Sequence, residues 1–180
     1  MSRLKKKYQQ EVVPALQQAL GLDNRLAVPR LIKVTVNVGI GKSLKDPKIG
    51  EVVTSTLERI TAQKPVPTKA KQSISNFKVR QGQIVGYVVT LRGERMYDFV
   101  DKLISITLPR VRDFRGLDPK TVDQQGNLNL GFKEHMAFPE IQADEVEKIH
   151  GLQVTITSSP GSREAGFELF RLLGFPFRQQ

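Results

Sequence analysis

Apolar side chains recur along the chain at two spacings, one typical of helices and one typical of strands. Between Leu4 and Leu20 they stand three or four residues apart, which predicts a helix. Pro14 should kink or restart this helix, because proline has no backbone N–H and its ring crowds the preceding turn. Gly21 should end it.

A strand is predicted next, in the stretch RLIKVTVNVGIG. Ile32, Val34, Val36 and Val38 stand at every second position, which is the period of a strand with one apolar face. The opposite, polar face carries Lys33, Thr35 and Asn37.

The next predicted elements are a helix and a hairpin. The helix has Asp46 as its N-cap, Pro47 in its first turn and an apolar stripe from Ile49 to Ile60. The stretch SISNFKVRQGQIVGYVVTLRG indicates two strands joined by a loop around Gly82, because glycine supplies the positive φ that a hairpin turn needs.

The periodic spacing of apolar residues is clear from Gly93, is lost over residues 110–139 and returns toward the C-terminus. A third helix is predicted from Gly93, with Pro109 stopping it, and residues 110–139 read as loop-rich. A short helix is expected around Asp144–Lys148, followed by a strand at LQVTIT. A last helix should start at Ser162 and end at Gly174.

These elements predict an α+β fold. We expect a single domain over residues 1–180 with a mainly antiparallel sheet, helices packed on one face and a polar RNA-binding face on the other. Residues from about 108 to 150 form a loop-rich appendage in this interpretation.

Charge narrows the range of partners. Residues 1–120 hold 23 Lys and Arg against 10 Asp and Glu, a balance of +13, while residues 121–180 hold 5 against 8, a balance of −3. The basic part favours a polyanion, usually nucleic acid, because each phosphate neutralised releases counterions. The alternative is ordinary solubilising charge. A membrane surface would instead require a basic amphipathic helix with bulky apolar residues opposite.

Composition excludes several kinds of site. The chain has no cysteine and only two isolated histidines, His135 and His150, so we expect neither disulfides nor a zinc centre. It shows no signal-peptide core and no apolar run long enough to span a membrane, so we expect a cytoplasmic protein.

Catalytic and nucleotide motifs also fail. GIGKS ends like a phosphate-binding loop, but Val36 stands where the first glycine belongs. Glu94, Asp98 and Asp101 lie at helical spacing beside cations, which is typical of a solvated face. We therefore expect no enzyme, no cofactor and no small-molecule substrate.

A polar strand face with basic surroundings remains the strongest feature. Hydroxyl and amide side chains on such a face suit the shallow minor groove of structured RNA. The residues that we expect to share this surface are Lys33, Thr35, Asn37, Thr90 and Arg92, with Lys69, Lys71, Lys78 and Arg80 on the next strand and its approaches. An RRM-like sheet is the alternative, but Phe77 and Tyr87 alone do not make its aromatic pattern.

The stretch LPRVRDFRG forms a second basic cluster, with Arg110, Arg112 and Arg115. We expect Val111 and Phe114 to anchor it on the core while the arginines point outward along an RNA backbone. Asp113 should orient one guanidinium. Alternatively, the arginines pair with Asp113 or Asp118 and serve only the shape of the loop.

Five stretches resemble one known family. They are VNVGIGKS, ITAQKPVPTKAKQSISNFKVRQGQIVGYVVTLRGERMYDFVDKLI, LPRVRDFRGL, GNLNLGFKEHMAFPEI and LGFPFR. They resemble bacterial large-subunit ribosomal protein five, which binds 5S ribosomal RNA, and the resemblance runs from the first helix to the C-terminal tail. It implies a structural place in the central protuberance, attachment of 5S rRNA to large-subunit rRNA, contact with P-site tRNA, and a bridge to small-subunit protein thirteen.

The resemblance also implies roles for particular residues. The family's 5S-recognition residues match Asn37, Gln63 and Thr90 here. The tRNA contact matches the hairpin tip, here Arg80, Gln81, Gly82 and Gln83. The bridge matches the acidic region from Phe132 to Ile149, with Lys133, Glu134, His135, Glu140, Asp144 and Glu145 as candidates.

Departures from the family pattern concern the loops. Gln124, Gln125 and Leu128 replace the usual loop residues, and His135 and Ala137 stand where glutamine and a larger aliphatic residue are common. Pro67 replaces an apolar residue. The sequence also leaves open a second function class, an extraribosomal regulator that binds structured RNA through the same surface.

Overall fold

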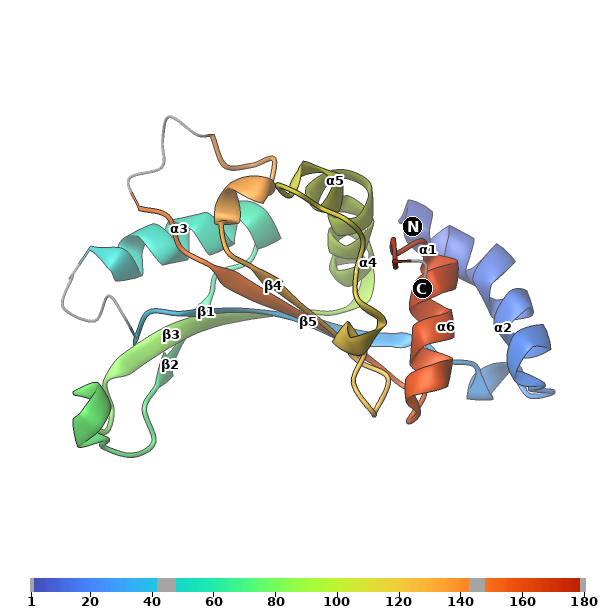
Figure 1. Cartoon of the computed structure of the whole chain (residues 1–180), viewed down its shortest axis with the longest axis horizontal. Helices are drawn as coiled ribbons and strands as arrows, with labels where there is room; N and C mark the ends of the chain where they lie inside the picture. The colour runs from blue at the N-terminus through green and yellow to red at the C-terminus, as the bar shows by residue number, and fades with distance from the viewer. Residues whose placement is uncertain (1, 42–47, 143–147, 179–180) are drawn as a thin grey trace. The chain divides into compact units, whose positions relative to one another are not determined.

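Five strands form one antiparallel sheet in the computed structural model of the chain, in the order β2-β3-β1-β5-β4 (Figure 1). The structure describes residues 2–41, 48–142 and 148–178. The strands are β1 Leu31–Gly39, β2 Val66–Lys69, β3 Ile84–Leu91, β4 Leu128–Phe132 and β5 Leu152–Ser158. The predicted α+β class and antiparallel sheet are confirmed.

The chain gathers into two compact units. The first unit consists of Met1–Val34, Leu91–Leu130 and Thr155–Gln180, and the second of Thr35–Thr90 and Gly131–Val154. Most helices belong to the first unit. The second unit holds one long helix, α3, together with β2, β3 and most of β1.

Helix α3, Ile49–Thr61, lies along one side of β1 and β3 in the second unit (Figure 1). A Cβ atom on Gly50 would come 2.6 Å from the Tyr87 hydroxyl oxygen, so Tyr87 faces this helix. The predicted stripe is buried at Ile49, Val53, Leu57 and Ile60. The predicted N-cap Asp46 and first-turn Pro47 lie outside the described residues.

The hairpin prediction was wrong in its first arm. The strand that pairs with β3 is Val66–Lys69, with Thr68 opposite Gly86, whereas residues 70–83 form a long loop. Within that loop Ser75–Phe77 makes a 3-10 turn. Pro67 is accommodated because β2 is an edge strand, where one side of the backbone makes no ladder hydrogen bonds.

The alternation predicted for β1 holds only from Val34 onward. Val34, Val36 and Val38 are fully buried, but Ile32 is 40% exposed and Leu31 is buried in its place. Two residues, rather than one, separate the buried Leu31 from the buried Val34, so the strict alternation of buried and exposed residues is interrupted there. Ile32 therefore does not belong to the apolar face.

Two helices of the first unit contain a wide turn just before a proline. The opening helix consists of α1 Arg3–Lys7, a π-helical turn Tyr8–Val12 and α2 Val13–Leu20. The next consists of α4 Gly93–Lys102, a π-helical turn Leu103–Thr107 and α5 Leu108–Arg110. The wider turn relieves the clash between the proline ring and the preceding carbonyl. Pro109 lies in the last turn, and the helix ends one residue beyond it, at Arg110, close to the predicted stop. Pro14 lies in the first turn of α2, where the α-helix restarts as predicted.

The remaining elements include one missed strand. Helix α6, Arg163–Leu173, begins after Ser162, whose hydroxyl accepts from the Ala165 N–H, and ends at Gly174 with φ 106°, as predicted. Strand β4 was read as loop, although Leu128, Leu130 and Phe132 are buried at alternate positions. Short 3-10 turns lie at Arg25–Ala27, Pro119–Thr121 and His135–Ala137. The helix expected at 144–148 falls mostly outside the described residues.

Candidate nucleic-acid interface

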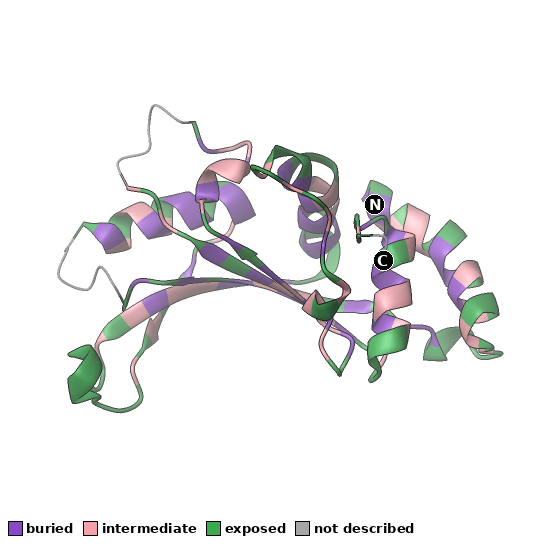
Figure 2. Cartoon of the chain, in the orientation of Figure 1, coloured by how far each residue is buried: buried purple, intermediate pink, exposed green. Residues whose placement is uncertain are grey.

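Helix α3 covers one side of β1 and β3 (Figure 1), and buried and exposed residues follow one another along these strands (Figure 2). Because Val36 and Val38 are fully buried, Thr35 and Asn37 lie on the opposite side of β1. Asn37 and Thr90 are exposed, and Thr35 is half-buried. Three of the residues predicted for the RNA surface therefore reach solvent in this unit.

Gln63 is fixed against the end of β3. It follows Ala62, which ends α3 in the left-handed region at φ 51°. The side-chain Nε2 of Gln63 donates to the Thr90 backbone carbonyl at 3.2 Å. The backbone carbonyl of Gln63 accepts from the Thr61 hydroxyl at 3.1 Å. The structure therefore brings Gln63 and Thr90 together, and the Thr90 hydroxyl is not the group that Gln63 uses.

The lysines and arginine predicted to surround this surface are placed as follows. Lys69 is exposed on β2, and Lys71 is exposed just beyond it in the loop. Lys33 is half-buried and Arg92 is exposed, and both belong to the first unit. Lys69 and Lys71 therefore add positive charge to the second unit.

The residues assigned to the hairpin tip lie at the base of the 70–83 loop. The Gly82 N–H donates to Ala70 at 2.9 Å, and the Ala70 N–H donates to Gln83 at 2.8 Å. The Gln83 side chain accepts from the Arg80 N–H at 3.1 Å. Gly82 has the predicted positive φ, 82°. The part of the loop farthest along the chain from this closure is the 3-10 turn Ser75–Phe77.

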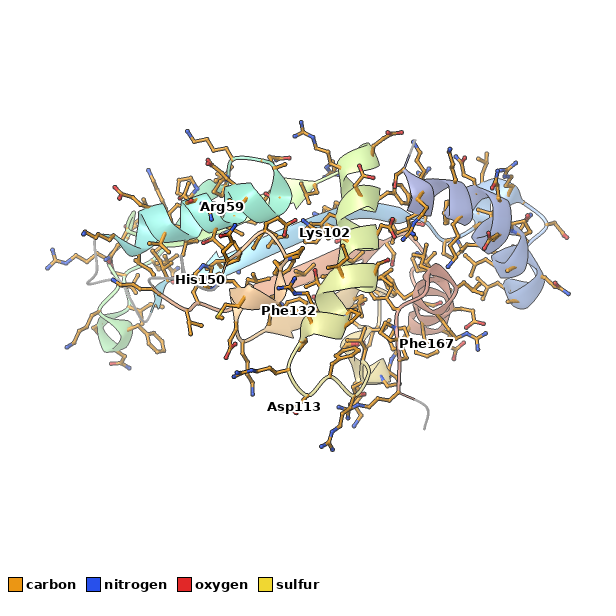
Figure 3. All side chains as sticks on the ribbon, turned by 90° about the horizontal axis from the view of Figure 1, so that it is seen from above. Arg59, Lys102, Asp113, Phe132, His150 and Phe167 are labelled. Carbon is orange, nitrogen blue, oxygen red and sulfur yellow. The ribbon has the colours of Figure 1, made fainter. Side chains whose placement is uncertain are left out.

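The three arginines of LPRVRDFRG are exposed, whereas Val111 and Phe114 are half-buried, as predicted. Asp113 does not orient a guanidinium: it lies at the outer bend of the loop (Figure 3) with φ 53°, and no ion pair joins it to an arginine within the described residues. Asp118 instead accepts from the Lys120 N–H at 2.8 Å. Within the described residues, neither carboxylate therefore forms an ion pair with the three arginines.

The C-terminal segment forms hydrogen bonds with the end of this loop. The sequence pattern did not predict this contact. The Leu117 N–H donates to Pro176 at 2.7 Å, and the Arg178 N–H donates to Leu117 at 2.9 Å. Arg178 Nε also donates to the Gly116 carbonyl at 3.2 Å. The ring of Phe177 packs 4.6 Å from that of Phe167 on α6. The motif LGFPFR could have predicted this contact, because the aromatic side chains that follow the last helix are stabilised by packing against another part of the protein.

The bridge candidates are divided by burial. His135 was predicted as a surface contact, but it is only 2% exposed. Its ring stacks on His150 with centroids 4.1 Å apart and planes 7° apart. Lys133 is exposed, and Glu134 and Glu140 are half-buried. Asp144 and Glu145 lie outside the described residues.

The two histidines close the ends of the 135–150 segment. The His135 N–H donates to the His150 carbonyl at 3.1 Å, and the His150 N–H lies 3.3 Å from His135 Nδ1. Burial, together with the neighbouring His135 ring, lowers the pKa of His150 to about 4. Burial also lowers the pKa of His135. Both rings are therefore neutral near pH 7.

The departures from the family pattern fall in different environments. Gln124 and Gln125 are exposed in a turn whose shape is set by Asp123, which accepts from the backbone N–H groups of Gln125 and Asn127 at 2.9 and 2.8 Å. Leu128 is fully buried. The replacement at Leu128 therefore concerns the core, and the glutamines concern the surface.

The described residues also include the acidic side chains that the sequence places on the solvated face of α4. The described part of the chain contains no group of three His, Cys, Asp or Glu that could hold a metal ion. Glu94 and Asp101 of α4 are engaged in ion pairs, with Lys5 at 3.3 Å and with Arg3 at 2.7 Å. No helix in the described ranges is long and apolar enough to cross a membrane.

Comparisons with known proteins show which family the chain is similar to. Residues 24–80 match the family model for ribosomal protein L5, and residues 84–177 match the model for the C-terminus of the same ribosomal protein family. The large ribosomal subunit protein uL5 of Halothermothrix orenii is 50% identical over 179 residues, 99% of this chain and 100% of that protein. The uL5 protein of Heliobacterium modesticaldum is 49% identical over the full length of both chains. That of Natranaerobius thermophilus is 51% identical over 98% of this chain and 99% of its own length.

Both halves of the chain are thus covered by one family, and the relatives align with it from end to end. This family is a structural component of the ribosome and not an enzyme. The chain belongs to the ribosomal protein L5 family.

Proposed function

We propose that this ribosomal large-subunit protein binds 5S rRNA and attaches it to the large-subunit rRNA, in the ribosome and hence in the cytoplasm. The observation that carries the proposal is the hydrogen-bonded pair Gln63 and Thr90, together with the exposed Asn37 on β1, the strand next to β3. The side-chain amides of Gln63 and Asn37 and the hydroxyl of Thr90 belong to the same unit. Their donors and acceptors are suited to hydrogen bonds with sugar hydroxyls and base edges.

The arginines at 110, 112 and 115 supply the contact to the rest of the rRNA in this proposal. Their guanidinium groups are exposed and lack carboxylate partners within the described residues. Arginine binds phosphate bidentately, so a cluster on one loop is suited to an RNA backbone. The C-terminal hydrogen bonds to Gly116 and Leu117 keep that loop in place.

Two further contacts belong to the proposal and rest on the family resemblance. Arg80 and its neighbours Gln81, Gly82 and Gln83 contact P-site tRNA. The acidic region from Phe132 to Ile149 meets the basic small-subunit protein thirteen, through Lys133, Glu134 and Glu140 and, from the sequence alone, Asp144 and Glu145. His135 is removed from this set because it is buried.

The test is a titration of 5S rRNA with Thr90→Val, which removes the hydroxyl but keeps the shape and the backbone carbonyl. The RNA group that pairs with the Thr90 hydroxyl would be left buried without a hydrogen bond, which weakens the binding free energy by about 1 to 3 kcal/mol. The affinity for 5S rRNA should therefore fall roughly 5- to 150-fold. Lys64→Ala, an exposed change beyond Gln63, serves as the matched control and should alter affinity only through charge. Unchanged affinity of a folded Thr90→Val protein would remove Thr90 from the site. Co-sedimentation with the large subunit in stoichiometric amount separates a ribosomal role from that of an extraribosomal regulator.

A further inference from the structure

The segment between β4 and β5 begins and ends at one place in the second unit. A Cβ atom on Gly151, just before β5, would come 2.9 Å from the carbonyl oxygen of Phe132, the last residue of β4. The 3-10 turn His135–Ala137 follows three residues after the end of β4. The shape of this turn therefore depends on how the two ends of the segment are joined.

His135 and His150 form that joint. The His135 N–H donates to the His150 carbonyl at 3.1 Å, and the two rings stack with centroids 4.1 Å apart. His135 Nδ1 lies 3.3 Å from the His150 backbone nitrogen and 3.2 Å from its carbonyl oxygen, so this ring nitrogen has a hydrogen-bond partner in either neutral tautomer. Backbone and side chain together hold the two residues against each other.

The backbone that carries the proposed bridge residues starts from this joint. The Phe138 N–H donates to the His135 carbonyl at 3.2 Å, and the Ile141 N–H donates to the Phe138 carbonyl at 3.2 Å. Phe138 is fully buried and anchors the middle of the run. Glu134 directly precedes His135, and Glu140 lies between Phe138 and Ile141. A displacement of His135 would therefore move the backbone at both glutamates.

Acid opposes this arrangement, because a second proton on His150 would find no acceptor. His150 Nδ1 lies 3.4 Å from the Gly151 carbonyl, whereas His150 Nε2 is buried and has no hydrogen-bond partner within the described ranges. A doubly protonated ring would place a charged N–H group at that buried atom, with the His135 ring stacked on it.

Neighbouring charges act on the two rings in opposite directions. The Glu134 carboxylate favours protonation of His135, although burial lowers the pKa of that ring overall. Lys71 lines the same open groove as His150, and its positive charge disfavours a second cation there. Burial and the His135 ring lower the pKa of His150 further, to about 4. The neutral pair is therefore the form that fits the fold.

We propose that the stacked pair His135 and His150 is an acid-sensitive clasp that positions residues 133–142 for contact with a basic protein. His135 is buried, so it acts through the turns that it anchors and does not touch the partner. The identity of the partner rests on the proposed bridge to small-subunit protein thirteen. The effect of the clasp on the segment is a property of this chain alone.

Hydrogen exchange of the full chain tests the clasp without a partner. The amides to follow are those of Phe138 and Ile141, with the Ile40 amide, which donates to Val85 at 2.9 Å in the same unit, as the control. Rates are divided by the intrinsic exchange rate at each pH. Protection of Phe138 and Ile141 should fall about tenfold or more between pH 7.5 and 5.5, because an opened segment binds a proton at the ordinary histidine pKa of 6.5 and the closed one only near 4. Protection of Ile40 should change much less.

Glutamine variants separate the clasp from a general effect of acid, because glutamine keeps a hydrogen-bonding side chain and does not titrate. The double variant His135→Gln with His150→Gln should show the same protection of Phe138 and Ile141 at both pH values. The proposal is overturned if the parent's protection is independent of pH, if the double variant keeps the parent's pH dependence, or if Ile40 loses as much protection as the other two amides.

Affinity for purified small-subunit protein thirteen at pH 7.5 tests the positioning role. His135→Ala should bind about 2- to 30-fold more weakly than the parent, and His135→Gln should bind as the parent does. If His135→Ala loses protection at Phe138 but binds like the parent, the clasp does not position the contact. If the parent itself does not bind, the proposed bridge is wrong and the positioning role with it, while the exchange measurement still decides whether the acid-sensitive clasp exists.

Discussion

Gln63 Nε2 donates to the Thr90 carbonyl oxygen at 3.2 Å, across 27 residues of sequence. This bond joins the end of α3 to the end of β3 through a side chain that was predicted either to bind RNA or only to cap the end of the helix. One amide hydrogen of Gln63 is therefore used inside the protein, and its other hydrogen and its oxygen remain for a ligand. The residue both shapes the strand end and offers polar groups beside it.

Gln63→Glu should reduce both stability and 5S affinity. The carboxylate cannot donate to the Thr90 carbonyl, so the cross-link is lost, at a cost of about 1 kcal/mol in the free energy of unfolding. Urea unfolding gives the first quantity and filter binding gives the second. Thr90→Val should lower only affinity. If Gln63→Glu keeps full stability, the hydrogen bond contributes nothing in solution.

Arg110→Ala and Arg112→Ala should weaken binding to rRNA without altering the melting temperature. Each exposed arginine that contacts a phosphate contributes roughly 0.7 to 0.9 to the slope of log K against log salt, so each variant should flatten it by that amount. Binding measured over a series of salt concentrations provides the slope.

Arg178→Ala is the informative comparison for these variants. Arg178 donates to the Gly116 carbonyl at 3.2 Å, so its removal should loosen the loop and lower the melting temperature. If Arg110→Ala and Arg112→Ala instead melt early while keeping the parent's salt slope, the arginines are structural and the proposed rRNA contact is wrong.

Gly166→Ala should destabilise the first unit, although alanine normally favours a helix by about 0.5 to 1 kcal/mol. A Cβ on Gly166 would come 2.5 Å from the Gly126 carbonyl oxygen, which also accepts from the Ser158 hydroxyl. Such overpacking costs about 1 to 3 kcal/mol. Gly131→Ala, where a Cβ meets nothing within 4 Å, should be near neutral. Chemical denaturation of both variants measures the difference, and equal stability would show that the turn at Gly126 can move.

Acid should weaken the stacked histidine pair. Folding lowers the pKa of His150 from 6.5 to about 4, so the unfolded chain binds more protons and stability falls as the pH decreases through this range. The facing groups are the two imidazoles and the carboxylate of Glu134. NMR titration of the ring protons is direct, because the chain has only these two histidines. A measured His150 pKa at or above 6.5 would contradict the buried stack, and His150→Gln should remove its share of the pH dependence.

Arg80→Ala should weaken retention of P-site tRNA and leave 5S affinity nearly unchanged. The Arg80 backbone N–H is held by Gln83 at 3.1 Å, so the fold should tolerate loss of the side chain. Ribosomes reconstituted with the variant provide the tRNA measurement. An equal loss of 5S binding would place Arg80 in the 5S site. Gln81→Ala is the uncharged comparison.

Local patterns of the sequence were sufficient for most elements. Helix α6 begins after Ser162 and ends at Gly174 as predicted, because capping residues and a helical apolar period act over a few residues. The buried face of β1 from Val34 to Val38 follows equally from its period of two. The exposure of the three arginines was also predictable, since their charge keeps them in water.

Other features depend on partners distant in the chain, and only the tertiary structure decided them. Val66–Lys69 is the strand that pairs with the outer side of β3, whereas the sequence offered another run of similar propensity nearby. Propensity alone does not choose between two such runs, because pairing depends on long-range register. His135 is buried, and His150, fifteen residues away in the chain, stacks on its ring. The local sequence around His135 does not predict a partner at that distance. The sequence by itself determined the helices, part of the strands, the charge and the family. The structure determined the remaining strands and which residues face one another, because long-range packing and not local preference selects those contacts.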